Sequence, residues 1–170
     1  MQEINLLPPE IINEIAAGEV IERPVAVVKE LIENSIDAKA SKITISIEEG
    51  GISKIVVSDN GIGIERKYIE TSVGRHTTSK LNMRTLNNII TLGFRGEALH
   101  SISNASEFTM ISRTKDSTEA YELKVIFGKP LSIKPSKGNV GTLIKVENIF
   151  RNLPVRKKFL KSENSESLAI

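Results

Sequence analysis

Three polar residues share one face of a segment that the sequence predicts to be a helix over 24–38. Glu30, Asn34 and Asp37 are separated by four and then three residues, which places them within about 60° of one another on an ideal helix. A carboxylate there can accept a proton from water, and an amide oxygen is a hard ligand suited to Mg²⁺. An apolar stripe is expected on the opposite side of the helix, so an ordinary solvated face is the alternative interpretation.

A second candidate group follows a short apolar run, Ile55-Val56-Val57, that is typical of a buried strand. The run continues as Ser58 and then Asp59-Asn60-Gly61-Ile62-Gly63. A carboxylate at a strand end can accept a hydrogen bond from an exocyclic amine, and glycines allow backbone to approach a ligand closely. Because Asp, Asn and Gly are also common turn residues, a simple turn is the alternative.

A third group, Gly93-Phe94-Arg95-Gly96-Glu97-Ala98-Leu99, opens a predicted helix. Backbone N–H groups at a helix N-terminus attract phosphate, and glycines permit the approach. A glycine-rich loop entering a helix is the alternative, and the arginine between two glycines makes it less attractive. The chain has neither a P-loop motif nor a dinucleotide-binding fingerprint, so phosphate binding would have to use another arrangement.

The elements that would position these groups follow from hydrophobic periodicity and turn residues. Helices are expected over 8–17 and 24–38, the second packing through Val28, Leu31, Ile32 and Ser35. A hairpin is expected from 43–47 and 55–57, and a short helix over 64–73. A polar loop over 74–92, with a short helix near 86–90, precedes the helix that ends at Asn104. The remaining strands are expected over 108–113, 121–127, 131–134 and 142–147, as a meander. This order predicts an α+β two-layer sandwich, with a mixed, largely antiparallel sheet and helices on one face.

Composition limits the classes of protein and site that are possible. The chain has 170 residues, of which 39% are hydrophobic and 26% charged, which suits one globular domain. It contains no cysteine and only two histidines, His76 and His100. Disulfides, thiolate metal sites and cysteine nucleophiles are therefore excluded, and most histidine-based metal sites are unlikely to form. No apolar run approaches the roughly 18 residues of a membrane span, and the N-terminus does not resemble a secretory signal.

Charge is distributed unevenly along the chain although the formal net charge is only +2. Residues 1–33 carry seven acidic and two basic residues, whereas residues 129–161 carry nine basic residues and one acidic residue, a balance of +8. A basic stretch of this kind favours polyanions such as DNA. Arg156, Lys157 and Lys158 are the candidate DNA-binding residues, and a solvated surface is the alternative.

The motifs in this order resemble those of the GHKL ATPases, a superfamily that includes gyrase B subunits, heat-shock chaperones, histidine kinases and MutL mismatch-repair proteins. The resemblance rests on residues 30–38, 59–63 and 93–99, and on Gly141-Thr142. Four further stretches resemble MutL proteins in particular, namely residues 15–24, 75–80, 93–99 and 152–160. With them, the resemblance covers almost the whole chain.

The resemblance implies a role for each matching residue. Glu30 would be the general base that activates water, Asn34 would bind Mg²⁺ between the ATP phosphates, and Asp59 would accept the adenine amino group. Thr142 would assist at the base, directly or through water. Asp37 keeps the family pattern, and we expect it either to support the residues that contact the ligand or to be structural. The pocket would be shaped by Gly61 and Gly63, and the lid over the phosphates would include Ser79, Lys80, Gly93, Phe94, Arg95 and Gly96.

The resemblance also implies an organisation and a set of partners. Residues 1–170 would form a GHKL ATPase domain that is incomplete at its C-terminus, with an N-terminal arm over 1–20, a lid over about 74–97 and a basic part over 129–161. ATP binding would pair two such domains into a clamp on DNA. The expected partners are a mismatch-recognition protein of the MutS type and a downstream nuclease or helicase, in the bacterial cytoplasm and at the nucleoid, with no membrane.

Two departures from the family pattern leave alternatives open. Arg151-Asn152-Leu153-Pro154-Val155-Arg156 lacks the threonine that the family usually has in this motif. The family also takes a lysine for the γ-phosphate from a domain that would follow Ile170. The alternatives are therefore a nucleotide- or DNA-binding fragment without turnover, or another GHKL ATPase such as a type II topoisomerase subunit.

Overall fold

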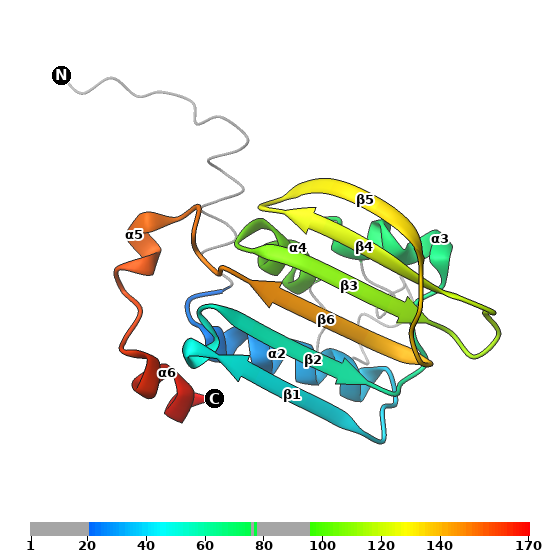
Figure 1. Ribbon diagram of the computed structural model, residues 1–170, viewed down its shortest axis with the longest axis horizontal. Coiled ribbons are helices and arrows are strands. Elements are labelled where there is room, and N and C mark those ends of the chain that lie inside the picture. Colours follow the sequence, from blue (N-terminus) through cyan, green and yellow to red (C-terminus); the bar gives the residue numbers. More distant parts are fainter. Residues whose placement is uncertain (1–20, 76, 78–95) are drawn as a thin grey trace, which may run out of the picture.

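The computed structural model describes residues 21–75, 77 and 96–170 (Figure 1). Its elements, in chain order, are α2 (Pro24–Asp37), β1 (Ile43–Glu48), η1 (Glu49–Gly51), β2 (Lys54–Asp59), α3 (Arg66–Ile69), η2 (Thr71–Val73), α4 (Ala98–Asn104), β3 (Glu107–Arg113), β4 (Ala120–Ile126), β5 (Lys129–Ser136), β6 (Gly141–Glu147), α5 (Pro154–Lys157) and α6 (Glu163–Ala169). The helices expected over 8–17 and near 86–90 lie outside the described residues. No helix in the described part is long and apolar enough to cross a membrane.

Six strands form one sheet in the order β1-β2-β6-β3-β4-β5, and every neighbouring pair is antiparallel. The expected meander is correct for β3, β4 and β5 but wrong for β6, which lies between β2 and β3. Ile144 of β6 is opposite Val57 on one side and Met110 on the other. These three side chains are buried, so inserting β6 joins the N-terminal hairpin and the later strands around one core.

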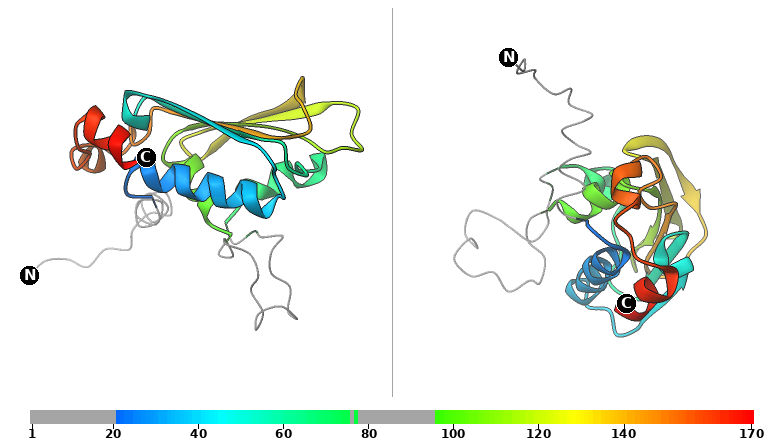
Figure 2. Two further views of the ribbon diagram at one scale, coloured as in Figure 1. Left: turned by 90° about the horizontal axis from the view of Figure 1, so that it is seen from below. Right: turned by 90° about the vertical axis from the view of Figure 1, so that its left-hand side faces the viewer.

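The helices form a layer on one face of this sheet, as the α+β sandwich prediction requires. Figure 2 shows α2 and α4 side by side beneath the sheet, whereas α5 and α6 lie at the end where η1 joins β1 to β2. The core between the layers combines Leu31 of α2 and Ile102 of α4 with Ile55 and Phe108 of the sheet, all at most 1% exposed. Burial of these apolar surfaces holds α2 against the strand ends that carry the candidate site.

α2 begins where the sequence predicts, because Pro24 occupies its first turn, where the fixed φ of proline favours the helix. Its buried face differs from the expected one. Pro24 and Val27 are buried together with the expected Val28, Leu31 and Ser35, whereas Ile32 is only half-buried. The packing stripe is therefore rotated around the helix toward the polar residues.

Candidate functional site

The rotated stripe changes the environment of the polar residues of α2. Val27 precedes Asn34 by seven residues, so the two side chains lie about 20° apart around the helix. Glu30, Asn34 and Asp37 are each half-buried. They flank the buried face instead of lying opposite it, so the expected position opposite the stripe is wrong. This placement fits side chains at the wall of a site better than a solvated face.

Asp59 lies at the end of β2, where its carboxylate joins α2, β2 and β6. Asp59 Oδ1 accepts hydrogen bonds from the backbone N–H groups of Gly61 (2.8 Å) and Thr142 (3.2 Å). Asp59 Oδ2 lies 3.1 Å from the hydroxyl of Ser35, which shares its one proton between this carboxylate and the carbonyl oxygen of Leu31, at 2.9 Å. Three neutral donors thus fix the half-buried carboxylate, and Oδ2 retains capacity for one further donor.

Thr142 also contacts β3, the strand on the other side of β6 from Asp59. Its Oγ1 is 2.9 Å from Oγ of Ser112 on β3, and that hydroxyl accepts a hydrogen bond from the N–H of Ile64, at 2.8 Å. The segment that follows Asp59 is therefore held against β3 and β6. The structure brings Asp59 and Thr142 together across 83 positions of sequence.

Gly61 and Gly63 allow this segment to lie close to its neighbours. A Cβ at Gly61 would lie 2.6 Å from the carbonyl oxygen of Ala38, at the end of α2. Gly63 has a φ of +71°, and a Cβ there would overlap the carbonyl oxygen of Arg113. Side chains at either position would push the segment after Asp59 away from α2 or β3. Both glycines therefore allow this segment to pack closely beside Asp59.

The chemistry of these side chains fits a nucleotide and one cation held mainly by that nucleotide. A fixed carboxylate with a remaining acceptor position suits an amine on a base. Among the described residues, no group of three or more histidine, cysteine, aspartate or glutamate side chains is arranged to hold a metal. Asn34 offers one hard amide oxygen, which matches Mg²⁺ because that ion takes few protein ligands and keeps phosphate and water oxygens.

Five of the predicted nucleotide-binding residues lie outside the described part of the chain, namely Ser79, Lys80, Gly93, Phe94 and Arg95. Gly96 is described and has a φ of +65°, a backbone conformation that favours glycine. It immediately precedes Glu97, the N-cap residue of α4. Of the six predicted lid residues, Gly96 alone lies in the described part of the chain, and its positive φ explains the glycine at this position.

The basic stretch over 129–161 is not one surface. Its first three lysines are on or just after β5, an edge strand, whereas α5 lies beyond the end of the sheet at which η1 joins β1 to β2 (Figure 1). Lys134 pairs with Glu122 and Lys145 with Glu147. Arg151 pairs with Glu107. At α5, Lys157 and Lys158 are exposed and Arg156 is half-buried, so a continuous +8 surface is not formed.

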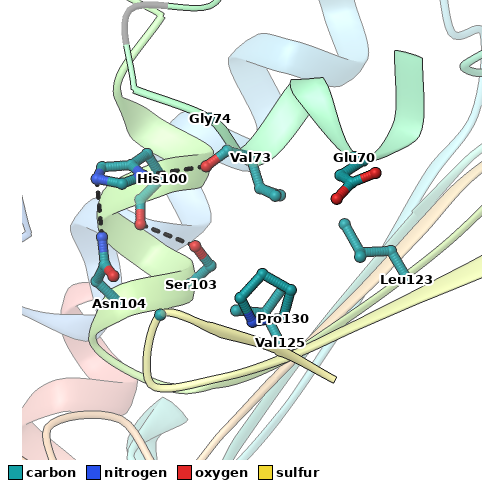
Figure 3. Close-up of a pocket in the computed structure, with 10 residues that line it drawn as sticks. Glu70, Val73, Gly74, His100, Ser103, Asn104, Leu123, Val125 and Pro130 are labelled. Carbon is teal, nitrogen blue, oxygen red and sulfur yellow. Dashed lines mark hydrogen bonds between the residues drawn. The ribbon is translucent and has the colours of Figure 1, made fainter. Parts of the chain in front are cut away.

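Two cavities lie away from the Asp59 junction. One, of about 220 Å³, is lined by residues of η2, α4, β4 and β5, including Val73, His100 and Leu123 (Figure 3). The other, of about 350 Å³, lies between η1 and α5 and includes Lys157 and Arg151. Neither cavity is lined by a residue predicted to bind nucleotide.

The sequence interpretation missed two serines that organise the junction. Ser35 was expected in the packing stripe, and it is buried as expected, but its hydroxyl also holds Asp59. Ser112, also buried, links Thr142 to the loop after Asp59. A serine on an apolar helix face was an incomplete signal for this contact, because a buried hydroxyl can also donate to the carbonyl oxygen one turn back, here that of Leu31 at 2.9 Å. Ser112 gave no comparable signal.

A family model matches the part of the chain that contains α2 and Asp59. Residues 22–134 match the model of the histidine kinase-, DNA gyrase B- and HSP90-like ATPases. The chain is 49% identical over 166 residues to the DNA mismatch repair protein MutL of Mannheimia succiniciproducens, covering 96% of this chain and 26% of that protein. It is 49% identical over 164 residues to the MutL protein of Endomicrobium trichonymphae, covering 96% of this chain and 28% of that protein.

The fold is also similar to a solved structure of the same kind. The Aquifex aeolicus MutL ATPase domain complexed with ADP is 39% identical, with a TM-score of 0.72, over 88% of this chain and 52% of that chain. The chain therefore spans about a quarter of the length of the curated relatives and about half of that ATPase domain.

Proposed function

The chain belongs to the family of histidine kinase-, DNA gyrase B- and HSP90-like ATPases, as a MutL-type member, and from this premise we propose that it binds Mg-ATP and supplies the residues that hydrolyse it. The observation that carries the proposal is the Asp59 carboxylate, fixed by Ser35, Gly61 and Thr142 beside the polar face of α2. Gly63 shapes the loop that completes this wall.

In this proposal Asp59 recognises adenine. Oδ1 is occupied by two backbone donors, so Oδ2 accepts a hydrogen bond from the exocyclic amine of the base. Thr142 supports the contact through its N–H on Asp59 and its hydroxyl, which is directed to Ser112. Guanine presents an oxygen at the corresponding position, which a carboxylate disfavours, so ATP is bound in preference to GTP.

Hydrolysis is proposed to use the neighbouring residues of α2. Glu30 accepts a proton from the water that attacks the γ-phosphate. Asn34, one turn further along the helix, would hold Mg²⁺ through its amide oxygen, and the bound ion would neutralise phosphate charge. Because α2 is packed on the core through Leu31, both side chains are presented from a rigid helix, which favours correct positioning for the reaction.

The phosphates are proposed to be contacted by the segment that connects η2 to α4. This segment contains the predicted lid residues, which are Ser79, Lys80, Gly93, Phe94, Arg95 and Gly96. Backbone N–H groups and cations in such a loop suit the charge of a triphosphate.

We further propose the role of the whole protein as a DNA mismatch-repair factor of the bacterial cytoplasm, acting at the nucleoid. In that role, ATP binding pairs two copies into a homodimer on DNA and couples a mismatch-recognition protein of the MutS type to a downstream nuclease or helicase. The support is the similarity to MutL proteins over nearly the whole chain. Arg156, Lys157 and Lys158 at α5 are proposed to contact DNA phosphates.

A comparison of the affinities for ATP and GTP analogues tests the proposed function directly. The chain is titrated with a non-hydrolysable ATP analogue and with the corresponding GTP analogue, each with Mg²⁺, by calorimetry. We expect tighter binding of the ATP analogue, and loss of most of that preference in Asp59→Asn. Asp116→Asn, an exposed aspartate far along the chain, is the control and should keep the preference. Equal binding of both analogues by the unmodified chain would contradict adenine recognition.

A further inference from the structure

His100 joins two segments that are far apart in the sequence. Its Nδ1 is 3.0 Å from the carbonyl oxygen of Val73, at the end of η2, and its Nε2 is 2.9 Å from Nδ2 of Asn104, one turn along α4. Figure 3 shows both contacts beside the cavity. The imidazole thus connects the residue before the segment 74–97 to α4, the helix that follows this segment.

The two contacts fit one tautomer of the ring. A carbonyl oxygen only accepts, so Nδ1 of His100 donates to Val73. The amide nitrogen of Asn104 donates, so Nε2 accepts. His100 in this tautomer accepts from one partner and donates to the other, which a side chain without a polar group cannot reproduce.

Asn104 extends the connection to a third segment. Its backbone carbonyl oxygen accepts a hydrogen bond from Nδ2 of Asn152, at 3.1 Å. Asn152 belongs to the turn before α5. The next residue, Leu153, is the N-cap of α5, and its carbonyl oxygen accepts a hydrogen bond from the N–H of Lys157, at 3.0 Å. The other side-chain atom of Asn152, Oδ1, is buried without a hydrogen-bond partner among the described residues. The amide is thus placed to serve the contact with Asn104.

An open pocket lies beside the His100 contacts. It has a volume of about 220 Å³ and lies between η2, α4 and the β4–β5 turn, where Val73, Ser103, Leu123 and Val125 are among its lining residues. Val73, Leu123 and Val125 also belong to the hydrophobic core, so apolar packing fixes this end of η2 as well. The His100 contacts add a polar link between the end of η2 and α4.

We propose that His100, Asn104 and Asn152 form a positioning bridge that couples the start of the loop 74–97 to α5. The bridge runs from Val73 through His100 and Asn104 to the turn before α5. This inference rests on the proposed function, in which the loop 74–97 contacts the nucleotide phosphates. Nucleotide binding then biases the position of α5, and the cations of α5 bias nucleotide affinity by the same factor, since such coupling is reciprocal.

Amide resonances of Lys157 and Lys158 report the coupling. They are recorded by NMR on the 170-residue chain, with and without saturating ADP, in the unmodified protein and in His100→Leu, His100→Gln, Asn152→Ala and Ser103→Ala. We expect ADP to shift both resonances in the unmodified chain, and expect His100→Leu and Asn152→Ala to reduce the shifts by about threefold or more. His100→Gln should restore them, because glutamine carries both a donor and an acceptor.

Ser103→Ala is the matched control. Ser103 lies on α4, lines the same cavity and donates to the carbonyl oxygen of His100, at 2.9 Å, but it is not part of the bridge. It should keep the full ADP-dependent shifts. If His100→Leu fails to fold, Asn152→Ala tests the same bridge from its other end.

The outcomes separate this inference from the proposed function. Failure of the unmodified chain to bind ADP would contradict the proposed function itself. ADP binding with unshifted Lys157 and Lys158 resonances, or with equal shifts in His100→Leu, would overturn the bridge alone. A merely structural role would lower the melting temperature of His100→Leu and His100→Gln together without separating their ADP-dependent shifts, and that result would also overturn it.

Discussion

Two carboxylates, Asp59 and Glu166, each have three polar contacts, but in contrasting surroundings. Asp59 is half-buried, and its donors are a hydroxyl and two backbone N–H groups. The Glu166 side chain is 0% exposed, and Arg23 contacts its Oε2 through Nε (3.2 Å) and Nη2 (3.1 Å). The N–H of Lys161 donates to Oε1, at 2.9 Å. The charge of Glu166 is therefore compensated by Arg23, whereas the contacts of Asp59 among the described residues come from neutral donors.

The surroundings of Glu166 explain its structural role. α6 packs against η1 so closely that a Cβ at Gly50 would lie 2.9 Å from the Cβ of Glu166. Arg23 is the residue just before α2. Glu166 thus ties the C-terminal segment to the start of the helix that carries Glu30 and Asn34. The two carboxylates have the same number of contacts, so the number of partners does not separate them. Asp59 is the one available to a ligand because its partners are neutral and it is partly exposed, whereas Glu166 is fully buried and paired with a cation.

The largest expected effect concerns turnover. Glu30→Ala should lower ATP hydrolysis about 10²–10⁴-fold, because a general base is lost, while nucleotide affinity stays nearly constant. Hydrolysis is measured in a longer chain that completes the ATPase domain, with binding measured by calorimetry. Glu33→Ala, which removes an i,i+4 pair with Lys29 on the same helix, is the control. Retention of more than about a tenth of the turnover would exclude Glu30 as the base.

The next effect separates the two carboxylates by affinity. Asp59→Asn should weaken ATP binding about 10–150-fold, because a charge-assisted hydrogen bond worth about 1.5–3 kcal/mol is lost. Glu166→Gln should bind ATP with nearly unchanged affinity. Calorimetric titration of both variants gives the comparison, and an equal loss of affinity in the two would mean that they do not have different roles.

The third effect reverses the comparison and concerns stability. Glu166→Gln should lower the free energy of unfolding by about 1–2 kcal/mol, because the amide NH₂ must face either Arg23 or the N–H of Lys161. We place the value at the low end because the Arg23 side chain is 34% exposed. For this chain length the melting temperature should fall by about 2–8 °C. Thermal denaturation followed by circular dichroism measures it, and an unchanged midpoint would show that the pair contributes nothing.

The smallest effect tests the division of the basic stretch. Replacing Arg156, Lys157 and Lys158 together by Ala should flatten the dependence of log K for duplex DNA on log[salt] by about two to three units, because each phosphate contact contributes about 0.9. The matched control replaces three cations on or just after the edge strand β5, Lys129, Lys134 and Lys137, and should leave the slope unchanged.

Two results would contradict this assignment. An equal flattening in both triple variants would show that DNA binds diffusely along the basic stretch. An unchanged slope after replacement at α5, with a normal melting temperature, would mean that these cations form only a solvated face.

Much of the fold followed from local sequence patterns. The apolar spacing in 24–38 and Pro24 at its start predicted α2 to within a residue, because side-chain periodicity and the φ of proline act over a single turn. The strands and the hairpin of β1 and β2 were also predicted close to their observed bounds. The motif order predicted the family, and the comparisons confirm it.

The arrangement of the site was less predictable. The position of β6 between β2 and β3, which brings Thr142 to Asp59, was not predicted. Strand order depends on which long-range pairings bury the most apolar surface, and adjacent strands in sequence are only the most common neighbours. The burial of Val27 could not be distinguished from exposure by its spacing alone, so the polar face of α2 was placed too far from the core.

The sequence by itself therefore determined the elements, the family and the identity of the candidate residues, since each depends on residue types within short segments. The tertiary structure alone decided which of those residues meet. It placed the Ser35 hydroxyl against Asp59, divided the basic stretch between the edge strand β5 and the end of the sheet that carries α5, and joined Val73 to Asn152 through His100 and Asn104. These outcomes depend on packing between segments that are distant in the chain, and periodicity within one segment carries no information about its partner.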